Sequence, residues 1–278
     1  MSQPAASPLL PTIAFIGGGN MASAIIGGLI HQGHPAGQIE VVEPWAEARE
    51  ALRKNYGIEA QAEAGPALQR AQIVVWAVKP QTFKDAAAQA KAHTQGALHL
   101  SVAAGIRSDS IAQWLGTERI VRTMPNTPAL VGKGMSALYA RPAVSAPERQ
   151  SIEAIMATTG EFLWVDSEPQ LDAVTALSGS GPAYVFYFLE AMTRAGTGMG
   201  LTEQQAHQLA VGTFVGASEL ARRSDDPPSV LRQRVTSKGG TTYAALQSME
   251  AAGVAASFEA AMRAAQHRAH ELGDEFGA

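Results

Sequence analysis

The sequence predicts an α/β protein in which a doubly wound, mostly parallel β-sheet is followed by an all-helical region. Short runs of β-branched and aromatic residues alternate with helical patterns as far as residue 166. From Glu168 onward no convincing strand occurs, and Ala-rich stretches with helical periodicity take over. We therefore expect two domains, residues 1–166 and 167–278, which a length of 278 residues also favours.

The alternation of strands and helices starts close to the N-terminus. Residues 13–16 form an apolar run typical of a buried strand, and a helical pattern follows with Gly33 free to take a left-handed cap. A second strand at 39–42 precedes a helix at 47–56, and the apolar run 73–78 indicates a strand covered on both faces. Further strands are expected at 98–102, 120–123, 135–139 and 161–165.

Composition narrows the class of protein. The formal net charge is −4 and the basic residues are scattered, so nucleic acid is not an expected partner. The chain has no cysteine, which excludes disulfides, thiolate metal sites and a cysteine nucleophile. No metal-ligand cluster, membrane-length apolar run or cleavable leader is evident. A cytoplasmic enzyme is the default expectation.

A glycine-rich loop joins the first strand to the first helix. Gly17, Gly19 and Ala22 fit the pattern G-x-G-x-x-A. The first glycine permits a tight turn, the second lets a pyrophosphate approach the backbone, and the small third residue lets helix and strand pack closely. The alternative is a glycine-rich turn without a ligand, but strand, loop, helix and second strand occur in the order of a Rossmann fold. We therefore expect a nicotinamide dinucleotide to contact Ile16, Gly17, Gly18, Gly19, Asn20, Met21 and Ala22.

Glu43 ends the second predicted strand, 26 positions after Gly17. A carboxylate there can accept hydrogen bonds from the ribose 2′-hydroxyl, which favours NAD over its 2′-phosphorylated form. The alternative is a solvated charge at a strand end. Arg49 is the nearest basic residue that could grip a phosphate.

Other strand ends are expected to line the same ligand. In open α/β sheets, ligands lie beyond the carboxyl ends of the strands. Lys79, which follows the third predicted strand, is either an ordinary surface lysine or a contact of the cofactor. The predicted contacts are Val78, Lys79, Pro80, Ala103, Ala104, Gly105 and Asn126, of which Asn126 could present its amide to the cofactor or the substrate.

Two stretches of the helical region are unusual. Glycines in 177–184 interrupt a helical pattern that restarts at Pro182, which indicates either a close approach to a ligand or a plain joint between helices. The stretch 235–242 combines hydroxyls and glycines at a helix start. Free N–H groups there form a ready anion site, suited to a substrate carboxylate. An ordinary N-cap is the alternative.

Four stretches in order along nearly the whole chain resemble pyrroline-5-carboxylate reductases. They are Val78-Lys-Pro80, Met124-Pro-Asn-Thr-Pro128, Leu177-Ser-Gly-Ser-Gly-Pro-Ala-Tyr184 and Arg234-Val-Thr-Ser-Lys-Gly-Gly-Thr-Thr242. The last is highly specific to that family, unlike the glycine loop. The resemblance implies hydride transfer from NADPH or NADH to the imine carbon of 1-pyrroline-5-carboxylate, giving L-proline. It also implies an interdigitated homodimer and a higher homo-oligomer.

The resemblance further implies a substrate site made of Asp225, Ser237, Gly240, Thr241 and Thr242. The substrate carboxylate would meet the Ser237 hydroxyl and the N–H groups of Thr241 and Thr242. The Thr242 hydroxyl would hydrogen-bond the ring nitrogen and assist its protonation, which makes Thr242 the candidate catalytic residue. Asp225 corresponds to an acidic family residue that can contact substrate.

Three residues depart from the pattern of the family. Lys238 replaces the usual proline, Asp225 a glutamate of many members, and Ala64 an asparagine that contacts the adenosine part. None of these changes removes a proposed hydroxyl or backbone donor. They bear on substrate affinity and cofactor preference rather than on the reaction.

Two other functions compete with this interpretation. A β-hydroxyacid dehydrogenase would use a lysine within a helix of the second domain, but Lys238 is the only lysine after Asp166 and lies before a helix. A non-catalytic dinucleotide-sensing protein would use the helical region for oligomerisation alone. The Thr241-Thr242 stretch argues against that second alternative.

Overall fold

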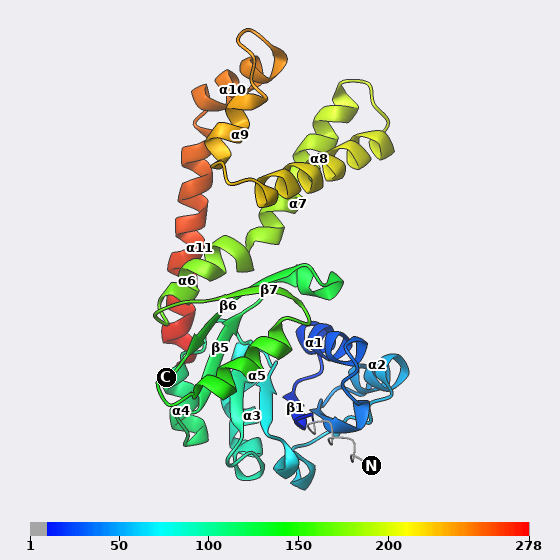
Figure 1. Ribbon diagram of the computed structural model, residues 1–278, viewed down its shortest axis with the longest axis vertical. Coiled ribbons are helices and arrows are strands. Elements are labelled where there is room, and N and C mark those ends of the chain that lie inside the picture. The colour runs from blue at the N-terminus through cyan, green and yellow to red at the C-terminus, as the bar shows by residue number, and fades with distance from the viewer. Residues whose placement is uncertain (1–9, 278) are drawn as a thin grey trace, which may run out of the picture. The chain divides into compact units, whose positions relative to one another are not determined.

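The structure, a computed structural model, describes residues 10–277 (Figure 1). Two compact units are present. The first comprises residues up to Ser180 together with those from Ala265 onward, and the second comprises Gly181–Ala264. The domain boundary expected between residues 166 and 167 stays a prediction.

The first unit is built on a seven-stranded sheet in the order β2-β1-β3-β4-β5-β6-β7. Strands β1 to β5 run parallel, while β6 pairs antiparallel with β5 and parallel with β7. The predicted mostly parallel sheet is confirmed. The strands are β1 (Ile13–Ile16), β2 (Ile39–Val42), β3 (Ile73–Trp76), β4 (Leu98–Ser101), β5 (Ile120–Met124), β6 (Gly134–Ala140) and β7 (Gly160–Trp164).

Helices cover both faces of this sheet (Figure 1). Alternate residues of one strand therefore enter different cores, as Phe15 and Ile16 do. This double burial explains why the strands read as continuous apolar runs. The helices of the first unit are α1 (Asn20–His31), α2 (Ala46–Tyr56), α3 (Pro80–Ala90), α4 (Ser108–Leu115), α5 (Ala146–Met156) and α6 (Gln170–Val174).

The second unit, Gly181–Ala264, consists of helices joined by loops and contains no strand. Its helices are α7 (Gly181–Gly198), α8 (Glu203–Arg223), α9 (Pro228–Arg234), α10 (Thr241–Ala251) and the first part of α11 (Val254–Phe276). Thr202 and Gln205 form a capping box at the start of α8, a pairing of residue types at a spacing that the sequence already shows. The glycine break is a π-helical turn at Thr175–Gly179, after which α7 begins.

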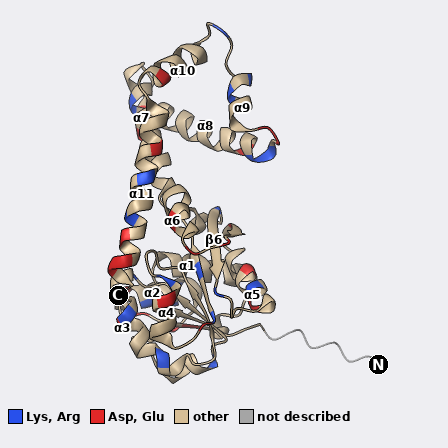
Figure 2. Cartoon of the chain, turned by 90° about the vertical axis from the view of Figure 1, so that its left-hand side faces the viewer, with Lys and Arg blue, Asp and Glu red and all other residues tan. Residues whose placement is uncertain are grey.

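Charges of both signs intermingle on α11, as Figure 2 shows. Arg268 pairs with Glu271 and Glu275 on that helix, and Arg263 lies 3.6 Å from Glu259. Such exposed pairs contribute little to stability. Their opposite charges offset one another along the surface of the helix. No helix within residues 10–277 has the length and apolarity needed to cross a bilayer.

His99 is a buried titratable group at the centre of the sheet. It lies on β4 with 2% of its surface exposed, and the Trp76 indole N–H donates to its Nδ1 at 3.0 Å. Burial, and then the charge of Arg119, lower the pKa of His99 to about 4. The ring is therefore neutral at neutral pH, with Nδ1 serving as the acceptor.

We expect His99 to make the fold less stable in acid. Its pKa is lower in the folded than in the unfolded chain, so its contribution is complete above pH 6.5 and is lost as pH falls toward 4. The largest loss from this one group is about 3 kcal/mol. Urea unfolding of the parent and of His99→Asn, which keeps an acceptor for Trp76, would be compared at pH 7 and pH 5. The free energy of unfolding should fall less between pH 7 and pH 5 in the variant than in the parent. Some fall should remain in the variant, because burial also lowers the pKa of His34. An equal fall in both proteins would contradict the assignment.

Candidate functional site

The carboxyl ends of β1 to β5 lie along one edge of the sheet because these strands are parallel. Every residue predicted to bind the cofactor lies at one of these strand ends, in the loop that follows it, or in the first turn of α1 or α3. Strand β1 lies between β2 and β3, so the glycine loop after β1 lies beside the ends of both neighbours. This is the edge at which α/β sheets bind nucleotides.

Gly17 must be glycine for two reasons. Its φ is +97°, and a Cβ at this position would lie 2.5 Å from the carbonyl oxygen of Ala77 after β3. Its N–H donates to the Val42 carbonyl at 2.8 Å. The turn is therefore held against both neighbouring strand ends at once.

Gly19 and the first turn of α1 are open, in contrast to Gly17. A Cβ on Gly19 would meet no atom within 4 Å, and Gly19 and Asn20 are exposed. No side chain caps α1 and its first turn holds no acidic residue. Ala22 is fully buried, which lets the helix pack close to the strands. Free N–H groups in open space at a helix start suit a pyrophosphate.

Glu43 is not the solvated charge that the sequence left as an alternative. It is 6% exposed, and its carboxylate accepts hydrogen bonds from the Gly18 N–H at 2.7 Å and the Trp45 N–H at 2.9 Å. Arg49 donates from Nη1 to the carbonyls of Glu43 and Pro44. The acid is thus built into the glycine loop, and its predicted contact with a ribose stays a prediction.

The segments after β3 and β4 differ in exposure. Lys79 is exposed and precedes Pro80, the first residue of α3, while Val78 is half-buried. Ala103 is buried, and Gly105 has a φ of +71°. A Cβ on Gly105 would lie 2.9 Å from Cβ of Leu272 on α11, so packing against this helix requires the glycine. No pattern in the sequence indicates that contact.

Asn126 uses both ends of its amide within the protein. Its Oδ1 accepts from the Met135 N–H at 2.9 Å, and its Nδ2 donates to the Ser178 carbonyl at 3.2 Å. The side chain therefore connects the loop after β5 to β6 and to the π-helical turn. Its predicted contact with cofactor or substrate stays a prediction.

The predicted substrate stretch forms the loop before α10 and the first turn of that helix. Ser237, Thr241 and Thr242 are exposed, and no side chain caps the helix at Gly240. The Gly240 N–H donates to the Ser237 carbonyl at 3.0 Å, and a Cβ on Gly240 would lie 2.6 Å from the Ser237 Oγ. The missing side chain thus leaves room for the hydroxyl.

Asp225 lies in the turn between α8 and α9 and is exposed. Its neighbour Asp226 binds Arg234, the last residue of α9, at 2.6 Å. This ion pair joins the turn that carries Asp225 to the residue just before the hydroxyl-glycine stretch. Sequence reasoning missed the pair because eight positions separate its members, a spacing that no helical rule connects.

Glu168 is a second polar group that the sequence did not single out. Its carboxylate accepts from the Ser108 N–H at 2.6 Å, from the Ser108 hydroxyl, and from Arg122 at 2.6 Å. Arg122 is buried on β5, so the pair satisfies a charge that would otherwise be costly. A carboxylate at the start of α4 also complements the helix dipole.

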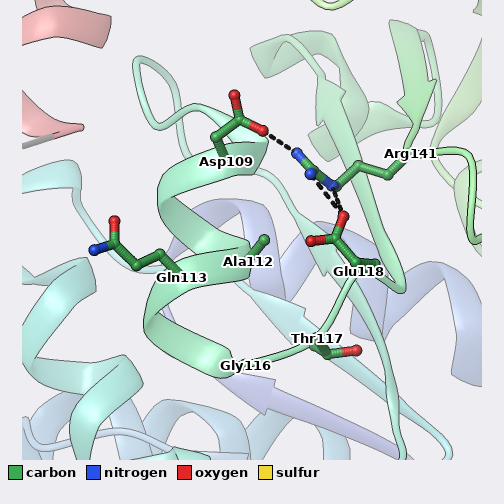
Figure 3. A pocket seen from close by; sticks show the side chains of 7 residues that line it. All are labelled: Asp109, Ala112, Gln113, Gly116, Thr117, Glu118 and Arg141. Carbon is green, nitrogen blue, oxygen red and sulfur yellow. Dashed lines mark hydrogen bonds and ion pairs between the residues drawn. The ribbon is translucent and has the colours of Figure 1, made fainter.

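A depression of about 520 Å³ lies beside α4, lined by Asp109, Ala112, Gln113, Gly116, Thr117, Glu118 and Arg141 (Figure 3). Arg141 crosses it and pairs with Asp109 and with Glu118. Its hydrogen bond to Asp109 is the main cause that raises the pKa of Arg141. With Arg141 paired to two acids, the depression offers no net positive charge to an anion, and none of the predicted site residues lines it.

Family models match both parts of the chain. Residues 168–272 match the model described as pyrroline-5-carboxylate reductase dimerisation. Residues 12–105 match that of coenzyme F420-dependent NADP oxidoreductases, a match that covers the glycine loop and the ends of β1 to β4.

Curated relatives match nearly the full length. The pyrroline-5-carboxylate reductase of Pseudomonas aeruginosa is 45% identical over 269 residues, covering 96% of this chain and 98% of the relative. That of Haemophilus influenzae is 41% identical and covers 94% and 97%.

Solved structures agree with the sequence relatives. A pyrroline-5-carboxylate reductase from Coxiella burnetii superposes with a TM-score of 0.88 at 37% identity, covering 95% of this chain and 98% of that chain. The Plasmodium falciparum pyrroline carboxylate reductase, solved with NADP bound, has a TM-score of 0.85 at 27% identity, with coverage of 95% and 98%. From the fold, the glycine loop and these relatives, we conclude that the chain belongs to the pyrroline-5-carboxylate reductase family.

Proposed function

We propose that the chain reduces 1-pyrroline-5-carboxylate to L-proline, the final step of proline biosynthesis, with NADH or NADPH as the reductant. Its curated relatives are named for this activity, and the chain matches them over almost their whole length. The bound dinucleotide supplies a hydride to the imine carbon, and the ring nitrogen takes up a proton. A protonated imine is a good hydride acceptor, so the chain's own task is chiefly to bind and orient.

The observation that carries this proposal is the uncapped, hydroxyl-rich start of α10. In our proposal the substrate carboxylate accepts hydrogen bonds from the Ser237 hydroxyl and from the N–H groups of Thr241 and Thr242. These N–H groups have no partner within the helix, and the helix dipole favours an anion there. Gly240 contributes by leaving the Ser237 hydroxyl uncovered.

Thr242 is the proposed catalytic residue. Its hydroxyl hydrogen-bonds the ring nitrogen and holds the proton that the nitrogen needs. Asp225 is proposed to contact the substrate from the turn before α9, whose position the Asp226–Arg234 ion pair maintains. Neither role requires a strong base.

The cofactor is proposed to lie along the edge of the sheet described above. The open first turn of α1 supports the pyrophosphate position, because its N–H groups and the bare Gly19 face open space. The proposed contacts are Ile16, Gly17, Gly18, Gly19, Asn20, Met21, Ala22, Glu43, Val78, Lys79, Pro80, Ala103, Ala104, Gly105 and Asn126.

We also infer a homodimer that assembles into a higher homo-oligomer, located in the cytoplasm, where reduced dinucleotides are supplied. Large apolar side chains are exposed on α7 and α8, among them Phe186, Tyr187, Leu209, Val215 and Leu220. Exposed apolar surface of this extent is typical of interfaces between chains.

The activity is tested directly by initial-rate reduction of 1-pyrroline-5-carboxylate with NADH and NADPH. We expect proline to form in proportion to the dinucleotide oxidised. Robust oxidation of small 3-hydroxy acids without pyrroline reduction would instead support a β-hydroxyacid dehydrogenase. Tight dinucleotide binding without any turnover would support a non-catalytic sensor.

Replacing Thr242 by alanine should slow reduction by at least about tenfold, because one hydrogen bond to the reacting nitrogen is lost. Cofactor binding should persist. Thr242→Ser keeps the hydroxyl and should recover most of the rate. Thr241→Ala is the matched control, since its proposed contribution is a backbone N–H that the substitution keeps. Equal turnover of Thr242→Ala and the parent would remove Thr242 from the mechanism.

Light scattering of the purified chain should give the mass of a dimer or of a multiple of dimers. Substituting Phe186 and Leu209 by serine should weaken assembly, because both are exposed in the single chain and add apolar area to the inferred interface. A stable, fully active monomer would contradict the inferred assembly.

A further inference from the structure

We infer that Glu43 makes this enzyme selective for NADH over NADPH, by directing a buried carboxylate at the adenosine ribose and by occupying the backbone N–H groups of Gly18 and Trp45. The inference rests on the proposed use of a nicotinamide dinucleotide. It goes further by naming which dinucleotide is bound and the residue that decides.

The position of Glu43 comes from the order of the strands. Strand β2 lies next to β1, and Glu43 follows β2 directly. A dinucleotide whose pyrophosphate lies on α1 extends its adenosine half over the end of β2, where the ribose 2′ position comes close to the residue after the strand. In this chain that residue carries a negative charge.

The carboxylate is held in place. It accepts the Gly18 N–H at Oε2 and the Trp45 N–H at Oε1, and the residue is 6% exposed. A Cβ on Gly18 would lie 3.2 Å from Cβ and Cγ of Glu43, so the loop and this side chain are in direct contact. The charge therefore cannot swing away from an incoming phosphate without breaking two hydrogen bonds.

The same hydrogen bonds favour a ribose with a free 2′-hydroxyl over a ribose with a 2′-phosphate. A carboxylate has about four lone-pair positions, so after accepting two N–H groups it can still accept a ribose hydroxyl. A 2′-phosphate is an acceptor with a charge of about −1.5 to −2. It would meet a like charge, while the Gly18 and Trp45 N–H groups that could have bound it are already used.

The nearest base is turned toward the backbone. Arg49 donates from Nη1 to the carbonyl oxygens of Glu43 at 2.9 Å and of Pro44 at 2.7 Å. It is the only Lys or Arg within residues 40–49, where Glu40, Glu43 and Glu47 are acidic. Glu40 pairs with Arg70, so the uncompensated charge of this segment remains negative.

The test is the affinity of the full-length protein for NADH and NADPH, measured by titration calorimetry without substrate, together with kcat/KM for both. We expect the parent to favour NADH at least about tenfold, since like charges at short range disfavour binding strongly. Raising the salt concentration should narrow this ratio by screening the repulsion. Equal affinity or a preference for NADPH, or a ratio that widens with salt, would overturn the inference.

Substitutions test whether Glu43 is the residue that causes the preference for NADH over NADPH. Glu43→Gln should reduce the NADH preference at least about tenfold, since an amide can still accept the Gly18 N–H but carries no charge. Glu47→Gln is the matched control: it removes an exposed acid four positions away and should leave the ratio within about twofold. An unchanged ratio in Glu43→Gln that still binds both dinucleotides would overturn the inference.

Two further measurements keep the outcome decisive. If Glu43→Gln does not fold, the parent protein is used instead. Its affinity for adenosine 2′,5′-bisphosphate is then compared with its affinity for adenosine 5′-monophosphate. Tighter binding of the bisphosphate would overturn the inference. Arg49→Gln should weaken NADH and NADPH alike, and a selective loss of NADPH would show Arg49 to be a phosphate ligand. Because binding is measured without substrate, failure to reduce the pyrroline would refute the proposed function and leave the selectivity standing.

Discussion

The close approach of Gly17 to the backbone of Ala77 is the constraint on which the dinucleotide edge of the sheet depends. With a Cβ position 2.5 Å from a carbonyl oxygen, no other residue fits without moving β1 away from β3. The same tight turn directs the chain into α1 and leaves the N–H groups of Gly19 and Asn20 exposed. The open anion site is therefore a consequence of how closely two central strands are joined.

Polar side chains, one buried and two half-buried, extend this constraint along the same edge. Glu43 holds the glycine loop from β2, Asn126 holds the loop after β5, and Glu168 holds the start of α4. Each accepts a hydrogen bond from at least one backbone N–H group, and that of Gly18, which is buried, would cost about 1–3 kcal/mol without a partner. The edge that must present donors to a ligand is thereby rigid, and the donors left open are those of α1.

Most of the fold could be predicted because burial on both faces leaves a strong local signal. All seven expected strands are present with ends within two residues of the expected positions, and the capping box of α8 forms at Thr202. Strand β3 ends at Trp76 rather than at residue 78, just before Ala77, whose carbonyl oxygen lies 2.5 Å from where a Cβ on Gly17 would be. The contact of Gly105 with Leu272 could not be predicted, because 167 positions separate the two residues.

By itself the sequence determined the strands, the turn at Gly17 and the hydroxyl-glycine start of α10, since each depends on residue types at short, fixed spacings. Only the tertiary structure decided what the polar groups at the strand ends do. Glu43 could have been a solvated charge, but the packing of Gly18 against it buries its carboxylate and gives it two N–H partners. Asn126 uses its amide on Met135 and Ser178, the latter 52 positions away. Partners so distant along the chain meet only when the core brings their elements together, and no local pattern records that meeting.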